Sequence, residues 1–130
     1  MSHPDPLLAP IPGTESRKLN GVQVDVGGAG AGRIKRAIYQ PGFRWSTHMK
    51  ATVGTEMCMH AHVGFIARGS IGVQYGDGNR FEFTAPQIVV IAPGHDGWVI
   101  GDEPAVLIEV DFMGDTAATF GLPDRLKRGK

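Results

Sequence analysis

Histidine is the residue of this chain best suited to chemistry, and four of its five copies lie in the middle of the sequence. They are His48, His60, His62 and His95. A neutral imidazole is a good ligand for zinc, iron, nickel and copper. Three imidazoles from separate strands would leave coordination positions open for water or a substrate. These residues therefore predict a site for one divalent transition metal, provided that the fold brings them together.

The segment before His62 adds other potential ligands. Along an extended strand Cys58, His60 and His62 would share one face, because side chains alternate between faces with a period of two. Glu56 adds a carboxylate two residues before Cys58. Cys58 is the only cysteine, which rules out an internal disulfide and fits a reducing compartment. The position is also compatible with a small buried apolar residue.

The sequence around these residues is patterned as short strands separated by turn residues. Gly76–Asn79 offers the positive-φ residues that a tight hairpin requires. Many short strands with regular turns are typical of a sandwich or a barrel, because such strands bury a face only against a second sheet. The expected strands are Arg33–Gln40, Phe43–Met49, Met57–Arg68, Ser70–Tyr75, Arg80–Thr84, Gln87–Ala92, Trp98–Ile100 and Ala105–Met113.

The 130 residues fit one domain with three parts. Residues 1–20 contain four prolines and are expected to form an extended arm. Residues 21–114 are expected to form the barrel, and residues 115–130 a helical turn over Asp115–Phe120 followed by a basic tail. The glycine-rich run 27–32 predicts a hairpin loop rather than a phosphate-binding loop, because the next segment alternates like a strand.

Charge and hydropathy argue against several classes of partner. Thirteen basic and thirteen acidic residues cancel, so the chain lacks the positive field that attracts nucleic acid or an anionic membrane. A membrane-spanning helix needs about 18 or more consecutive apolar residues, and no such run occurs. The first residues have neither the cationic start nor the apolar stretch of a secretory signal. We therefore expect no nucleic acid and no membrane as partner, and a cytoplasmic location.

Two stretches of the chain resemble the motifs of the cupins, a family of small jelly-roll barrels. The cupin motifs are G-x5-H-x-H-x3-4-E-x6-G and G-x5-P-x-G-x2-H-x3-N, and in the family their three histidines and the glutamate hold a divalent metal. The run Gly54–His62 reproduces the beginning of the first motif, with His60 and His62 as its histidines. In this register no glutamate follows, and Gly69 arrives too early.

A second register matches both ends of the first motif. Gly42 and His48 enclose five residues, and His62 and Gly69 enclose six. Lys50 then takes the position of the second histidine and His62 that of the glutamate, while residues 51–59 become an insertion. We prefer this register because it accounts for both ends.

The second motif is present in altered form. Gly94 matches it, but Gly97 occupies the position of the last histidine, and His95 lies two residues earlier. A shift of two keeps a strand side chain on the same face, so His95 would still face the barrel interior. The run Ala92–Pro104 also resembles a group of small stand-alone bacterial cupins that share a Pro-Gly-His-Asp-x-Trp signature.

The resemblance implies an all-β fold, the double-stranded β-helix or jelly-roll barrel of the cupins. It implies a divalent transition metal (zinc, iron or nickel) held by His48, His62 and His95. Further side chains are candidates for an additional ligand or for contacts to a substrate. These are Glu56, Cys58, His60, Lys50 and Trp98.

Three kinds of function are compatible with this resemblance. The first is a metal-dependent enzyme acting on a small molecule, such as a dioxygenase or an isomerase, with the metal as Lewis acid or oxygen-activating centre. The second is a module that binds or senses a small molecule without turnover, with or without metal. The third is a structural domain that has lost its metal. The resemblance also implies a homodimer, because small cupins commonly pair through sheet edges and exchanged N-terminal arms.

Overall fold

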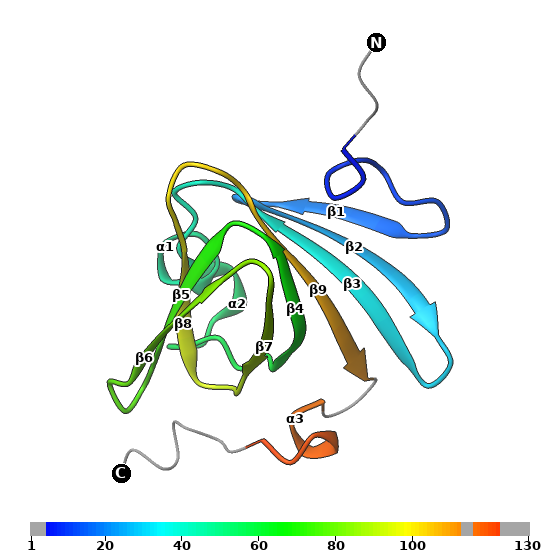
Figure 1. Cartoon of the computed structure of the whole chain (residues 1–130). Helices are drawn as coiled ribbons and strands as arrows, with labels where there is room; N and C mark the ends of the chain where they lie inside the picture. The colour runs from blue at the N-terminus through cyan, green and yellow to red at the C-terminus, as the bar shows by residue number, and fades with distance from the viewer. Residues whose placement is uncertain (1–4, 113–115, 123–130) are drawn as a thin grey trace.

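The computed structural model describes residues 5–112 and 116–122, and these fold into two antiparallel sheets (Figure 1). The larger sheet has the strand order β1-β2-β3-β9-β4-β7, and the smaller has the order β6-β5-β8. The prediction of an all-β fold is confirmed. The strands are β1 (Glu15–Leu19), β2 (Val22–Ala29), β3 (Gly32–Tyr39), β4 (His62–Arg68), β5 (Ser70–Tyr75), β6 (Arg80–Thr84), β7 (Gln87–Ile91), β8 (His95–Ile100) and β9 (Ala105–Phe112).

Apolar side chains from both sheets meet in one core. Ile66, Val89 and Leu107 come from the larger sheet, and Ile71 and Val73 come from β5 of the smaller one. Each is at most 7% exposed. Burying one such side chain contributes roughly 1.5–3 kcal/mol, so this shared core holds the two sheets together.

Strand β9 places acidic side chains inside the barrel. Leu107 belongs to the core, Glu109 contacts His62, and Asp111 contacts Arg33, so alternate residues of β9 face inward. Glu109 and Asp111 are each only 2% exposed. Buried carboxylates of this kind require partners, since an unpaired buried charge is strongly destabilising.

Two stretches that we expected to be strands differ in the structure. Trp45–His48 forms the short helix α1 and Lys50–Val53 forms α2, so the strand expected over Phe43–Met49 is wrong. The amide N–H groups of this stretch bond to carbonyls four residues back, as from His48 to Arg44, instead of to a neighbouring strand. The strand expected over Met57–Arg68 begins only at His62, where β4 starts.

The turns of the chain follow the sequence more closely. The hairpin expected at Gly76–Asn79 joins β5 to β6, and the glycine-rich run 27–32 contains the turn between β2 and β3. Helix α3 spans Thr116–Thr119, inside the expected helical turn, whose first residue Asp115 lies outside the described residues. The first twenty residues include β1, which pairs with β2. No helix of the described residues is long and apolar enough to span a membrane.

Candidate metal site

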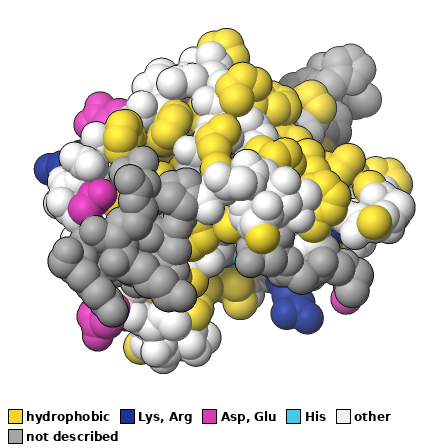
Figure 2. All heavy atoms as spheres, turned by 90° about the horizontal axis from the view of Figure 1, so that it is seen from below, with side chains coloured by type: hydrophobic (Ala, Val, Ile, Leu, Met, Phe, Trp, Pro, Cys, Tyr) yellow, Lys and Arg dark blue, Asp and Glu magenta, His cyan; other side chains and the backbone are white. Residues whose placement is uncertain are grey.

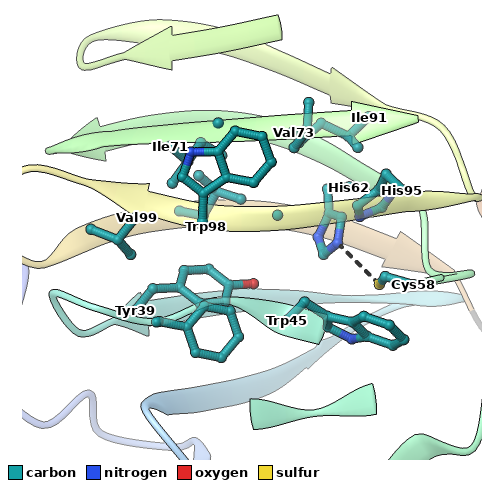
Figure 3. A pocket seen from close by; sticks show the side chains of 14 residues that line it. Tyr39, Trp45, Cys58, His62, Ile71, Val73, Ile91, His95, Trp98 and Val99 are labelled. Carbon is teal, nitrogen blue, oxygen red and sulfur yellow. Dashed lines mark hydrogen bonds between the residues drawn. The ribbon is translucent and has the colours of Figure 1, made fainter. Parts of the chain in front are cut away.

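Three potential metal ligands meet inside the barrel: Cys58, His62 of β4 and His95 of β8 (Figure 3). The Sγ atom of Cys58 lies 3.9 Å from Nε2 of His62, and the ring centroids of His62 and His95 are 5.2 Å apart. One ligand atom from each residue lies within 4.8 Å of the others. His95 is only 3% exposed. The side chain of His62 is 13% exposed, so both imidazoles are recessed, and the face seen from below shows almost no histidine surface (Figure 2).

The backbone fixes Cys58 beside His95. The N–H of Cys58 donates to the carbonyl of His95 at 2.7 Å, and the N–H of His95 donates back to the carbonyl of Cys58 at 3.2 Å. Gly94 donates to the same Cys58 carbonyl at 2.8 Å and has a φ of 93°, a conformation that favours glycine. The backbone of Cys58 is therefore held beside His95 at the start of β8, although Cys58 itself belongs to none of the strands β1 to β9.

A close approach of β4 to β9 places His62 against Glu109. Nδ1 of His62 lies 2.6 Å from Oε1 of Glu109. Gly64 of β4 stands opposite Glu109 in the strand register. A Cβ atom at Gly64 would lie 1.8 Å from the carbonyl oxygen of Ile108, so only glycine permits this spacing of the two strands.

Each imidazole has one ring nitrogen held by a fixed acceptor. Nδ1 of His62 faces the Glu109 carboxylate, and Nδ1 of His95 donates to the carbonyl of Ala92 at 2.7 Å. In a neutral ring with its proton on Nδ1, the lone pair is on Nε2. Metal-binding histidines characteristically donate their other N–H to a carboxylate or a carbonyl, which fixes the tautomer and the ring orientation.

The site favours a thiolate at Cys58. Burial raises the pKa of the thiol, but the hydrogen bonds and charges of His62 and His95 outweigh burial and lower it to about 5. Burial lowers the pKa of His62, whereas the charge of Glu109 and hydrogen bonds to Cys58 and Glu109 raise it to about 10. Burial also raises the pKa of Glu109, but the charge of His62 lowers it overall. Without a metal, the three groups form a buried thiolate, imidazolium and carboxylate series.

A second group of potential ligands, His60, His62 and Glu109, is less suited to a cation. Nζ of Lys35 lies 2.7 Å from Nε2 of His60 and 3.4 Å from the carboxylate of Asp111. Burial, together with the charges of His62 and Lys35, lowers the pKa of His60 to about 4. The neutral ring therefore accepts a hydrogen bond from the Lys35 ammonium, which occupies the lone pair that a metal would need.

A pocket opens beside the first group of ligands. Its volume is about 70 Å³, and Cys58, His62 and His95 line it. Aromatic and aliphatic side chains form most of the remaining wall, as the close-up shows (Figure 3). These are Tyr39, Phe43, Trp45, Ile71, Val73, Ile91, Trp98, Val99 and Leu107, together with Gly72 and Gly97. A ligand in the pocket would lie next to the three potential metal ligands.

The structure brings together two of the three histidines that we expected to bind a metal. His62 and His95 lie in the site, and Cys58 accompanies them. His48 ends α1, where its Nδ1 lies 3.1 Å from the carbonyl oxygen of Arg44 and its ring stacks on Phe43 at 5.5 Å. Among the described residues His48 belongs to neither group of potential ligands.

The other predicted contacts are divided between the site and the surface. The ring of His60 lies 5.1 Å from that of His62, and Trp98 lines the pocket. Lys50 and Glu56 form an ion pair at 2.9 Å, and their side chains are 41% and 85% exposed. Neither of these two residues lines the pocket.

Sequence reasoning missed Glu109 and Tyr39. A signal for Glu109 was present. Glu109 and Asp111 alternate with apolar residues, and all other residues of the strand Ala105–Phe112 are hydrophobic. An acidic residue at an inward position of such a strand indicates a buried partner. Tyr39 had no comparable signal, since a tyrosine at the end of a strand is common in a core.

Comparisons with known proteins identify the fold. No protein-family model matches the sequence, and no curated protein sequence is significantly similar to it. Among solved structures, the capsular polysaccharide assembling protein CapF of Staphylococcus aureus matches with a TM-score of 0.53 and 16% identity, over 79% of this chain and 29% of its own. A cupin-like protein of Thermotoga maritima has a TM-score of 0.50 and 18% identity, over 70% and 68%. Oxalate decarboxylase of Lactobacillus farciminis has a TM-score of 0.51 and 18% identity, over 76% and 31%.

The chain has the jelly-roll barrel fold of the cupins. It spans 29% of the length of CapF and 31% of the length of the oxalate decarboxylase, so the likeness concerns only part of each larger chain. The expectation of a cupin fold is confirmed. Within that fold, the described residues include groups of histidine, cysteine and glutamate that could hold a metal ion.

Proposed function

We propose that this chain binds one divalent transition metal through Cys58, His62 and His95 and presents it to a small molecule in the adjacent pocket. The observation that carries the proposal is the convergence of one sulfur and two imidazoles, each imidazole with its Nδ1 held by another group. Two imidazoles with one thiolate suit zinc and other first-row metals such as iron or nickel.

The spacing of Cys58 and His62 is close to that of two zinc ligands. In a tetrahedral site with Zn–S near 2.3 Å and Zn–N near 2.0–2.1 Å, sulfur and nitrogen stand about 3.6 Å apart. The Cys58 Sγ to His62 Nε2 distance is 3.9 Å, so a shift of a few tenths of an ångström would bring this pair to that spacing. The ligand atom of His95 lies within 4.8 Å of both. The pKa of Cys58 is about 5, so its sulfur is already a thiolate at neutral pH, whereas the pKa of His62 is about 10, so metal binding would release one proton from this ring.

Three protein ligands leave a coordination position for a molecule in the pocket, which is the arrangement of catalytic rather than structural metal sites. When bound, the metal would supply Lewis-acid or redox chemistry. Cys58, His62 and His95 would hold it, and Glu109 would keep the His62 ring in place. The proposed activity is that of a metal-dependent oxygenase or isomerase. A binding or sensing protein would differ in releasing its small molecule unchanged after incubation with metal and oxygen.

A second candidate function follows from the same contacts. Cys58, His62 and Glu109 form a series of nucleophile, base and orienting carboxylate, joined at 3.9 Å and 2.6 Å. Such a series activates the nucleophile when no metal is bound to the thiolate sulfur. It predicts covalent labelling of Cys58 by a small electrophile that full occupancy with zinc would prevent.

Metal analysis after reconstitution tests the main proposal. Protein purified without a nickel column and incubated with zinc should hold about one ion per chain. Cys58→Ser and His95→Ala should lower this to a small fraction, because each removes a ligand. His48→Ala is the matched control and should retain the metal, since His48 lies outside the group. Circular dichroism of each variant separates loss of metal from loss of fold. Full zinc retention by folded Cys58→Ser protein would contradict the proposal.

We also propose that the protein acts as a cytoplasmic homodimer. A thiolate ligand requires Cys58 to stay reduced, which is the condition of the cytoplasm. Pairing is supported by the outer apolar face, which we define as the exposed side chains Ile34, Phe65, Ile88, Val90 and Val110 of four adjacent strands. Large exposed apolar patches are rare on monomers. In a twofold dimer the same patch meets itself, and these five side chains carry no charge that would oppose that contact.

A further inference from the structure

We propose that the pocket takes a small uncharged molecule with a flat apolar body and one hydrogen-bonding group that faces the Tyr39 hydroxyl. The inference rests on the proposed function, because this molecule would lie beside the proposed metal ligands. It names the chemical class of the ligand, which the metal site alone leaves open.

The lining is mostly apolar. Of the fourteen described residues that form it, only Tyr39, Cys58, His62 and His95 offer hydrogen-bonding groups beyond the indoles and the backbone. Lysine, arginine, asparagine, glutamine, serine and threonine are absent from the lining residues. A sugar or another polyhydroxylated molecule would lose its water contacts in such a pocket without replacing them, at a cost of roughly 1–3 kcal/mol for each unpaired group.

The charges around the pocket also disfavour an anion. No lysine or arginine of the described residues lines the pocket, whereas the Glu109 carboxylate lies 2.6 Å from His62, which does line it. A carboxylate ligand would therefore meet no lysine or arginine in the lining and would approach a buried carboxylate.

The cationic side chains around the pocket lie outside its lining, including Arg80, which lies 5.0 Å from the centroid of the Trp98 ring. Lys35 contacts Asp111 at 3.4 Å and His60 at 2.7 Å, and it does not line the pocket. Arg44 lies 4.5 Å over the ring of Trp98 and pairs with Asp96, and its side chain is 44% exposed. Arg44 is therefore a solvent-facing residue at the edge of the site rather than an anchor within it.

Tyr39 supplies the polar group that a ligand would meet. Tyr39 is half-buried and its ring packs against Phe43 at 5.0 Å, while its hydroxyl makes no hydrogen bond to the described residues. Burial, with the charges of Glu109 and Cys58, raises the pKa of Tyr39 well above its ordinary value, so the hydroxyl keeps its proton. A hydroxyl that faces an apolar pocket without a protein partner needs one from a ligand or from water. In the close-up the hydroxyl points into the pocket (Figure 3).

The size of the pocket limits the ligand to about one ring. The pocket volume is about 70 Å³. One water needs roughly 10–15 Å³ on this scale, so the pocket holds a molecule of about five to seven non-hydrogen atoms. Aromatic rings at Tyr39, Phe43 and Trp45 favour a flat body, because offset and edge-to-face ring contacts are stabilising. Phenol has the required shape, size and single hydroxyl.

Calorimetric titration with phenol, benzoate and toluene tests the inference. The three probes share one ring and differ in carrying a hydroxyl, a negative charge or neither. Zinc-loaded protein should bind phenol at least tenfold more tightly than benzoate. Tyr39→Phe should weaken phenol binding about three- to tenfold, the usual effect of one lost hydrogen bond, and leave toluene binding unchanged. The indole N–H signals of Trp45 and Trp98, the only two tryptophans, would show by NMR that phenol enters this pocket.

Several results would overturn the inference. Benzoate binding as tightly as phenol would do so, and loss of that binding in Arg44→Gln would locate an anion site at the edge instead. Equal binding of phenol by Tyr39→Phe and wild-type protein would remove the role of the hydroxyl. The metal content of the same samples separates the two proposals. Zinc without phenol binding contradicts only the ligand class, whereas preferential phenol binding by protein that takes up no zinc contradicts only the metal site.

Discussion

His62 is the residue on which the site depends, because its two ring nitrogens serve different partners. Nε2 faces Cys58, and Nδ1 faces Glu109 at 2.6 Å. The carboxylate fixes the ring plane and increases the electron density on Nε2. In the proposed site Glu109 would be a positioning residue, acting on the metal through His62.

Removing the charge of Glu109 should weaken metal binding without removing a ligand. We expect Glu109→Gln to lower zinc affinity about 10- to 100-fold, the typical effect of losing such a partner. Competition with a chelator of known affinity measures this. Glu82→Gln, at an exposed position of β6, is the control and should bind zinc like the wild type. If Glu109→Gln kept the wild-type affinity, Glu109 would have no positioning role.

The thiolate of Cys58 can be observed directly, because the chain has no other cysteine. In metal-free protein its ultraviolet absorbance should appear with a midpoint near pH 5 and persist as the pH rises. His62→Gln removes the neighbouring charge while burial remains, so the midpoint should move up toward or beyond the ordinary value of 9.0. Identical midpoints in the two proteins would show that His62 does not stabilise the thiolate.

The sequence predicted part of this site. His62 and His95 were expected to be ligands from cupin-like spacing, and Cys58 was named as an additional contact. The place of His48 depended on a strand that the structure replaces with α1. Motif spacing reports position along the chain, but the direction of a side chain also depends on local backbone conformation, which Phe43–Met49 does not reveal by its polar and apolar pattern.

At the scale of elements, the site depends on how closely β4 lies against β9. Gly64 permits this approach, since a Cβ atom there would overlap the carbonyl oxygen of Ile108 at 1.8 Å. The backbone pairing between Cys58 and His95 likewise holds these two potential ligands close together. Neither contact was visible in the sequence, because both depend on pairing between residues far apart along the chain.

A single methyl group at Gly64 should disturb both fold and site. We expect Gly64→Ala to lower the free energy of unfolding by about 1–3 kcal/mol through overpacking, and to reduce zinc affinity by displacing His62 from Glu109. Urea denaturation and chelator competition measure the two effects. Gly28→Ala in β2 is the control, since a Cβ there meets nothing within 4 Å, and its stability should change by less than about 1 kcal/mol. Equal stability of the two variants would show that β4 can move away from β9 at little cost.

At the scale of the whole molecule, the all-β architecture was predicted from strand length and turn spacing. Alternating short strands and hairpin glycines leave few alternatives to two packed sheets. The strand order was not predictable in the same way. The neighbours of β9, namely β3 and β4, are distant in sequence, and no local pattern identifies such partners.

The outer apolar face should mediate pairing of two copies. Ile88 is its most exposed member at 72%, so Ile88→Lys should convert a dimer into a monomer by placing two ammonium groups in the contact. Light scattering at micromolar concentration measures the mass. Val53→Lys on α2, where the valine is 52% exposed, is the control and should remain dimeric. A monomeric wild-type protein under these conditions would disprove the pairing.

X-ray absorption at the zinc edge tests the central claim most directly, because it identifies the ligand atoms. For zinc-loaded protein we predict one sulfur at about 2.3 Å and two imidazole nitrogens at about 2.0–2.1 Å. The sulfur contribution should disappear in Cys58→Ser protein. A spectrum of nitrogen and oxygen neighbours alone in the wild type would contradict the account, since Cys58 would then lie outside the metal site.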